Sequence, residues 1–359
     1  MALLDLSALY ARYGPRGGEP YAPEVLLGLL LYGYATGVFS SRKIERATYE
    51  AVPFRFIAGN LHPDHDTLAT FRRTFLPELK DLFVQVLLLA QEAGVLKLGT
   101  ISLDGTKVHA DASKRKAVSY KRLRELEIQL RAEVEELFIR AEQSEQPEVT
   151  DGLVVQEEIA RRQDRLTRLA EDTDPESRMM KNPTNAGFEQ DYNAQVAVDQ
   201  ASLLIVGYAL SNHPNDSQEA EPTFQAIPSA IGTPEAAALD AGYFGPATLT
   251  ACAKRGIEPY IATGRDPHHP SWQQRFSPLP DPPPEDASAL VKMAYKLKTA
   301  LGKAIYGARK CTVEPLIGII KEVLGVRQFS LRGTQAAAGE WCLVCLAFNL
   351  KRFHTLSWA

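Results

Sequence analysis

The chain has 359 residues, of which 45% are hydrophobic and 23% charged, and its formal net charge is −4. This composition excludes collagenous, disulfide-scaffold and wholly disordered proteins, and the length predicts about two domains. The charge is uneven, however: residues 291–359 carry eleven basic and three acidic side chains, whereas residues 186–290 carry four and thirteen. This asymmetry indicates either a polyanionic partner near the basic segment or two solvated faces of opposite sign.

The cysteines and the apolar runs favour a cytoplasmic protein. Four cysteines are too few for a disulfide framework. The pair Cys342 and Cys345 lies in an apolar pattern without a second ligand pair nearby, which favours a buried helix over a zinc site. The longest apolar run, residues 25–38, is interrupted by glycines, and the N-terminus lacks the layout of a signal peptide.

Residues 1–93 are predicted to form an all-helical N-terminal domain. Pro23 suits a first helical turn, and a run of leucines follows it. Further helices are predicted at residues 42–49, 66–75 and 77–93. A domain of this kind is suited to DNA binding or assembly, although no spacing within it requires DNA.

Residues 94–359 are predicted to form an α/β domain, because strand and helix patterns alternate there. The predicted strands are residues 98–104, 192–199, 203–210, 236–240 and 257–262. The predicted helices are residues 217–227, 247–254, 289–301, 313–324 and 334–350. Gly105 is expected to turn the chain after the first strand. This order of elements predicts a mixed sheet flanked by helices.

Two segments are predicted to lie outside that sheet. Residues from about 117 to 180 are rich in Glu, Arg and Leu with helical spacing, which indicates an inserted helical hairpin. Residues from about 263 to 288 are proline-rich and lack periodicity, which indicates a surface loop.

Two aspartates, Asp104 and Asp240, each close a short apolar strand. Ligand-binding groups of open α/β sheets gather at the carboxyl ends of strands. Two carboxylates placed there repel each other unless a cation lies between them, and Mg²⁺ is the cation that such oxygen ligands prefer. A single aspartate after a strand is more often a turn residue, but two in the same context favour a metal site.

The segment YGARKCTVEPLIGIIK, residues 306–321, carries a third carboxylate, Glu314. Glu314 and Lys321 are two helical turns apart and would project from one face, with Pro315 in the first turn of the helix. A carboxylate could hold metal there, while cations and a phenol contact phosphates. The candidate phosphate-binding residues are Tyr306, Arg309, Lys310 and Lys321. The alternative is an amphipathic helix with a solvated face.

Six segments together form a specific combination: YAPEVLLGLLLYGYATGVFSSRKIER, PDHDTLATFRR, LDGTKVHADAS, DYNAQVAVD, LDAGYF and the signature that ends in VEPLIGIIK. Through them the chain resembles, over nearly its whole length, the DDE transposases of bacterial insertion sequences. The resemblance implies a helical N-terminal region, an RNase H-like catalytic core, and a nucleoid-associated protein when active. The implied partners are double-stranded DNA (terminal inverted repeats and target DNA) and further copies of the chain, in a homodimer or larger assembly.

The resemblance also implies site residues. The catalytic and metal-binding residues would be Asp104, Asp240 and Glu314. The remaining letters of the tyrosine–arginine–glutamate–lysine signature would be Tyr306, Arg309 and Lys321. Four residues separate Arg309 from Glu314, where the usual pattern has three, so Lys310 is the alternative to Arg309.

The implied reaction is two-metal phosphoryl transfer with Mg²⁺, for which Mn²⁺ could substitute. It would nick the end of an element and join its 3′-hydroxyl to target DNA. Two alternatives remain: a generic RNase H-like nuclease, and a catalytically impaired DNA-binding relative shortened at its N-terminus, since the first family segment begins at Tyr21.

Four other acidic or basic residues rank lower as candidates for the site. Asp216 is expected to form a turn and a helix cap rather than bind metal. His109 follows Asp104 by five residues and could approach the site. Asp64 and Asp66 are expected to cap a helix.

Overall fold

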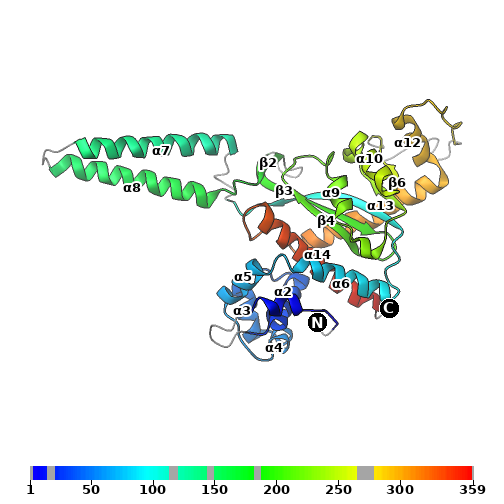
Figure 1. Cartoon of the computed structure of the whole chain (residues 1–359), viewed down its shortest axis with the longest axis horizontal. Helices are drawn as coiled ribbons and strands as arrows, with labels where there is room; N and C mark the ends of the chain where they lie inside the picture. Colours follow the sequence, from blue (N-terminus) through cyan, green and yellow to red (C-terminus); the bar gives the residue numbers. More distant parts are fainter. Residues whose placement is uncertain are drawn as a thin grey trace.

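A computed structural model describes residues 3–13, 21–112, 120–143, 149–181, 187–264 and 279–357. It confirms the predicted α/β class, because a run of helices is followed by a six-stranded mixed sheet with helices around it (Figure 1).

The N-terminal region is helical, as predicted. Its helices are α1 (Ser7–Ala11), α2 (Pro23–Thr36), α3 (Ser41–Glu50), α4 (Val52–Ile57), α5 (His65–Thr74) and α6 (Leu79–Glu92). Pro23 is the first residue of α2, and Asp64 caps α5 by accepting a hydrogen bond from the Thr67 backbone N–H at 2.8 Å. The short helices α1 and α4 were not predicted, because five or six residues are too few to establish a helical period.

The sheet consists of β1 (Thr100–His109), β2 (Arg178–Lys181), β3 (Phe188–Asp199), β4 (Ile205–Ser211), β5 (Ala236–Leu239) and β6 (Glu258–Ile261). The central strand β1 is antiparallel to β3 on one side and parallel to β5 on the other, and β6 lies parallel to β5 at the edge. Strands β2 and β4 pair with different stretches of the other edge of β3. The parallel half of the sheet therefore has one common carboxyl edge.

The expected turn at Gly105 is wrong, because β1 continues through it to His109. The pairing of β1 with β3 is unbroken from Ile101, opposite Asp199, to His109, opposite Asp191. Glycine is needed here for another reason: a β-carbon at residue 105 would lie 2.2 Å from the Gln195 amide nitrogen.

The inserted hairpin consists of α7 (Tyr120–Gln143) and α8 (Val149–Asp172), which pack along each other and project away from the sheet near β2 (Figure 1). Strand β2 falls inside the range predicted as helical. Most of the proline-rich loop, including His268 and His269, lies outside the described residues.

Helices cover both faces of the sheet. On one side lie α9 (Ala220–Gln225) and α10 (Pro246–Arg255). Two 3₁₀ turns flank β5, η1 (Ser229–Ile231), which contacts α6, and η2 (Ala241–Tyr243). On the other side of the sheet lie α13 (Ala300–Gly318), continued by a π-helical segment Ile319–Val323, and α14 (Thr334–Ser357) (Figure 1). Helix α12 (Ala289–Lys298) packs on β6 and α13.

Helix α14 joins the two halves of the chain. It packs against α2 and α6 on one side and against β4 on the other, and Cys342 and Cys345 are buried in it. Its buried Glu340 accepts a hydrogen bond from the Tyr34 hydroxyl at 2.7 Å, and Arg72 donates to the same hydroxyl at 3.1 Å. One hydrophobic core therefore spans the N-terminal helices and the sheet. The domain boundary near residue 93 stays a prediction.

Among the described residues, no single helix combines the length and apolarity needed to cross a bilayer. Helices α2 and α3 meet those criteria only when taken together, across a bend of 97°.

Candidate active site

The two aspartates predicted at strand ends lie side by side. Leu103 of β1 is in register with Leu239 of β5, and these strands are parallel, so the next residues, Asp104 and Asp240, lie at the same edge of the sheet. Helix α13, which carries Glu314, packs across β1, β3, β5 and β6. The fold thus brings together carboxylates from three segments that are distant in sequence.

A single guanidinium, that of Arg309, joins the three carboxylates. Its Nη2 lies 2.6 Å from Asp104 Oδ2 and 4.0 Å from Asp240 Oδ2, while its Nη1 lies 3.1 Å from Glu314 Oε1. The Arg309 side chain is only 6% exposed, whereas those of Asp240 and Glu314 are 53% and 49% exposed. The site is therefore closed on the helix side and open to solvent on the other.

The two aspartates are held in the same way. Asp104 Oδ1 accepts a hydrogen bond from the Gly105 backbone N–H at 2.9 Å, and Asp240 Oδ1 accepts one from the Ala241 N–H at 2.6 Å. In each case the other oxygen, Oδ2, is the one nearer Arg309. One oxygen of each carboxylate is thus fixed by the backbone, and the other faces the shared space.

The electrostatics of the site depend on burial. The pKa of the Asp104 carboxyl is raised to about 6, chiefly by burial; Arg309 and the Gly105 N–H oppose the rise, and the carboxylates of Asp240 and Asp216 add to it. Burial lowers the pKa of Arg309, but Asp104 and Asp240 outweigh burial and the net shift is upward. Asp104 is therefore a carboxylate whose charge needs a neighbouring cation.

The structure places Arg309, and not Lys310, among the carboxylates. Lys310 is the next residue of α13 and is exposed. A helix turns by about 100° per residue, so the two side chains cannot share one direction.

The predicted start of this helix is wrong. We expected Arg309 to precede the helix and Pro315 to lie in its first turn, but α13 begins at Ala300, where the Thr299 hydroxyl accepts a hydrogen bond from the Gly302 N–H at 3.0 Å. Pro315 is consequently inside the helix and leaves the Cys311 carbonyl without its helical donor. Because Arg309 is helical, its side chain can reach Glu314 on the following turn.

The other signature residues lie on either side of this contact. Tyr306 is one turn before Arg309 and contributes to the rise in the Arg309 pKa. Lys321, in the π-helical segment, is half-buried and donates a hydrogen bond from Nζ to the Lys107 carbonyl of β1 at 2.8 Å. Burial lowers the pKa of Lys321.

The residues present fit a divalent cation. Three carboxylates supply the hard oxygen donors that Mg²⁺ and Mn²⁺ prefer, and the space between them already accommodates the positive guanidinium of Arg309. Asp104, Asp240 and Glu314 are the groups that would hold the metal.

A second group of potential ligands lies further along β1. The ligand atoms of His109, Glu189 and Asp191 lie within 4.8 Å of one another. His109 Nδ1 is 2.7 Å from Asp191 Oδ1 and 3.5 Å from Glu189 Oε2. His109 thus contacts its neighbours on β3, and no contact described in the structure joins it to the three carboxylates.

The sequence reasoning missed a role for Asp216. It does not cap α9, whose N-cap is Glu219; its side chain instead accepts hydrogen bonds from Asn193 and Gln195 of β3, each at 2.8 Å. The signal in the sequence was the pair of amides, Asn193 and Gln195, that alternates with Ala194 and Val196 along β3, because buried amides need partners.

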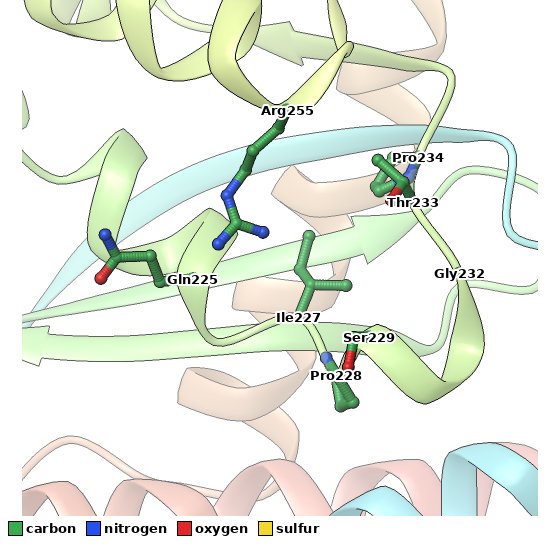
Figure 2. Close-up of a pocket in the computed structure, with 8 residues that line it drawn as sticks. All are labelled: Gln225, Ile227, Pro228, Ser229, Gly232, Thr233, Pro234 and Arg255. Carbon is green, nitrogen blue, oxygen red and sulfur yellow. The ribbon is translucent and has the colours of Figure 1, made fainter.

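A cavity of about 260 Å³ lies elsewhere, at the start of β5 and thus at the opposite end of that strand from Asp240 (Figure 2). It is lined by Gln225, Ile227, Pro228, Ser229, Gly232, Thr233, Pro234 and Arg255. It contains none of the residues predicted for the site.

The chain thus combines a mixed sheet with three carboxylates and a helix-borne arginine at one edge, an arrangement suited to binding a divalent cation. Comparison with protein families assigns the chain more closely. The family described as "Transposase DDE domain" matches residues 168–350, and the one described as "Transposase domain (DUF772)" matches residues 1–74. No curated protein and no solved structure matches the chain.

The chain therefore belongs to the transposase DDE domain family, and the predicted resemblance is confirmed. It is a DNA transposase in general function, with DNA as its substrate. The DDE match contains Asp240, Glu314 and the other signature residues but not Asp104, whose place in the site depends on the geometry alone.

Proposed function

We propose that the protein catalyses metal-dependent strand cleavage at the ends of an insertion sequence and transfers the resulting 3′-hydroxyl to target DNA. The single observation that supports this proposal is the convergence of Asp104, Asp240 and Glu314 on one guanidinium. When bound by these carboxylates, Mg²⁺ or Mn²⁺ would activate a water or 3′-hydroxyl nucleophile and stabilise the leaving oxygen.

The other residues of the site would orient the aspartates, balance their charge and contact phosphates. The backbone N–H groups of Gly105 and Ala241 orient the two aspartates. While no metal is bound, the Arg309 guanidinium balances the negative charge of the carboxylates. Once the guanidinium moves away from the carboxylates, its planar N–H donors also suit a phosphate oxygen. The helical stretch that carries Arg309 has Tyr306 before this residue and Lys310 and Lys321 after it. These three side chains would contact neighbouring phosphates.

The proposal includes a homodimer or larger assembly on DNA. An element has two ends, and each chain carries one set of the three carboxylates, so coupled reaction of both ends requires at least two copies. The contacts between basic side chains and the phosphate backbone of DNA should weaken as the salt concentration rises.

The test uses the purified full-length chain, a duplex that carries the inverted repeat found beside its gene, and Mg²⁺ or Mn²⁺. We expect a nick at the element end and then a joined product. Glu322→Gln, which alters an exposed carboxylate after the same helix, serves as the matched control and should react like the wild type. Binding without nicking would favour the impaired DNA-binding relative, and nicking without joining would favour a generic nuclease.

A further inference from the structure

A cluster of four polar side chains lies behind the catalytic aspartates. Successive residues of a strand point to opposite faces, so Asp104 faces Arg309 while Gly105 faces the other side of the sheet. Gly105 is in register with Gln195 there, and this face is the one on which Asp216 meets the sheet. We define the polar clamp as Asn193, Gln195, Asp216 and Tyr243.

Four hydrogen bonds hold the polar clamp together. The Asn193 and Gln195 side-chain amides both donate to Asp216 Oδ1 at 2.8 Å, and Gln195 also donates to Asn193 Oδ1 at 3.0 Å. The side-chain oxygen of Gln195, Oε1, accepts a hydrogen bond from the buried Tyr243 hydroxyl. Both donors and the acceptor of Gln195 are therefore used, which fixes the orientation of its amide.

The clamp touches the residues that follow both aspartates. A β-carbon on Gly105, directly after Asp104, would lie 2.7 Å from Asp216 Oδ1 and 2.2 Å from the Gln195 amide. A β-carbon on Gly242, two residues after Asp240, would lie 3.5 Å from Asp216 Oδ2. Tyr243, which belongs to the 3₁₀ turn capped by Asp240, is a member of the clamp itself.

We infer that Asp216 is a positioning residue, which fixes the separation of Asp104 and Asp240 by anchoring the polar clamp against Gly105 and the η2 turn. This inference deepens the proposed function and rests on it for its link to metal binding. Asp216 Oδ1 already accepts two amide N–H groups, so its role is that of a hydrogen-bond acceptor. Asparagine also offers an acceptor oxygen and should replace it, whereas alanine should not.

The first measurement needs neither metal nor DNA. Hydrogen–deuterium exchange of the full-length chain should become faster in Asp216→Ala over residues 100–109 and 239–246 together, and should stay at the wild-type rate in Asp216→Asn. The matched control is Glu221→Ala, an exposed carboxylate on the adjacent helix α9, which should alter neither segment. If Asp216→Ala leaves both segments as protected as in the wild type, the inference is wrong.

The second measurement is Mn²⁺ binding by calorimetry without DNA. Loss of a residue that orients metal ligands typically weakens binding about 10–100-fold, so we expect that loss for Asp216→Ala and less than about threefold for Asp216→Asn. Gly105→Ala, in which residue 216 is still Asp, should show the same loss of Mn²⁺ affinity. This second variant keeps the test valid if Asp216→Ala fails to fold. If Asp216→Asn is as weak as alanine, the Asp216 charge itself is required and the positioning role is wrong.

The two measurements separate the inference from the proposed function. If the wild type binds no Mn²⁺ but Asp216→Ala exposes both segments, the proposed metal chemistry fails and the clamp stands. If the wild type binds Mn²⁺ through Asp104 and Asp216→Ala changes neither measurement, the clamp fails and the proposed function stands.

Discussion

Two groups of side chains, each with one member on the central strand β1, differ in how their carboxylates are neutralised. The first group, around Asp104, draws its members from β1, the end of β5 and α13, and one arginine faces all three carboxylates. The second group consists of His109 of β1 with Asp191, its paired residue on β3, and Glu189, which is also on β3.

The difference indicates which group is available to a ligand. In the second group Asp191 is only 1% exposed: its Oδ1 lies 2.7 Å from His109 Nδ1, and its Oδ2 is buried without a hydrogen-bond partner among the described residues, so this carboxylate is closed off from solvent. In the first group the carboxylates of Asp240 and Glu314 are about half exposed, and the guanidinium of Arg309 contacts both. Proximity of acidic residues is common to both groups, whereas exposed carboxylate oxygens are found in the first.

The largest expected effect is the loss of cleavage when a carboxylate of the first group is replaced, and its absence would contradict this comparison. Asp104→Asn, Asp240→Asn and Glu314→Gln should each lower Mg²⁺-dependent end cleavage about a thousandfold or more, because each removes a metal ligand. His109→Gln should change cleavage less than about threefold, since the side chain is no ligand of this site. Single-turnover cleavage assays measure both, and a gel-shift assay should find DNA binding retained. Equal losses from both groups would contradict the distinction.

The next prediction sharpens the role of the arginine. Arg309→Ala should lower cleavage about a hundredfold, as loss of a charged donor at a reacting phosphate does, whereas the exposed Lys310→Ala should cost less than about fivefold. The same cleavage assay compares the two variants. If Lys310→Ala lost more cleavage activity than Arg309→Ala, then Lys310, which has the usual spacing from Glu314, would be the basic residue of the signature.

The third prediction concerns the free energy of unfolding. Replacing an aspartate should raise it in the first group and lower it in the second. The pKa of Asp104 is about 6 in the folded protein and 3.8 ordinarily, so the unfolded state binds fewer protons between these values and stability falls as pH rises. At pH 8 without metal, Asp104→Asn should therefore raise the free energy of unfolding by about 2–3 kcal/mol. Asp191→Asn should lower it by about 1 kcal/mol, because it weakens the contact with His109. Urea unfolding measures both, and the same sign for the two variants would contradict the comparison.

The smallest expected effect is a pH dependence. As pH falls from 7 to 5, Asp104 becomes protonated around its pKa of about 6, and protons should compete with Mn²⁺ for its carboxyl group. The affinity for Mn²⁺ should decrease by about tenfold per pH unit below that pKa. Calorimetric titrations at fixed ionic strength measure this, and a flat profile between pH 5 and 7 would show that Asp104 does not control binding.

Part of the site could be predicted because its signals are local. The strands before Asp104 and Asp240 are short, apolar and followed directly by a carboxylate, and parallel pairing places their ends together. Glu314 could be assigned only through the signature, because nothing in the spacing of α13 specifies which strand ends it covers. The helix start was wrong because the first turns of α13, residues 300–308, are rich in Gly and Ala and lack a strong apolar period.

The clamp and the length of β1 depend on long-range contacts. Gly105 follows an apolar strand in the sequence and so suggests a turn, but unbroken pairing with β3 keeps it extended. Asp216 stands among Asn, Pro and Ser residues, which are typical of turns. Only the register of β3 reveals that two amides lie opposite it, and register is set by the partner strands rather than by the loop itself.

The position of α14 has a consequence for protein synthesis. This helix is the last element of the described chain, yet it fills the core between the first helices and the sheet and supplies Glu340 to Tyr34 and to the Ser330 backbone. A ribosome releases the N-terminal helices long before α14 emerges, so those helices wait with an uncovered apolar surface. The core should therefore close only after α14 has been synthesised, and truncated products that lack this helix should be substrates for chaperones and proteases.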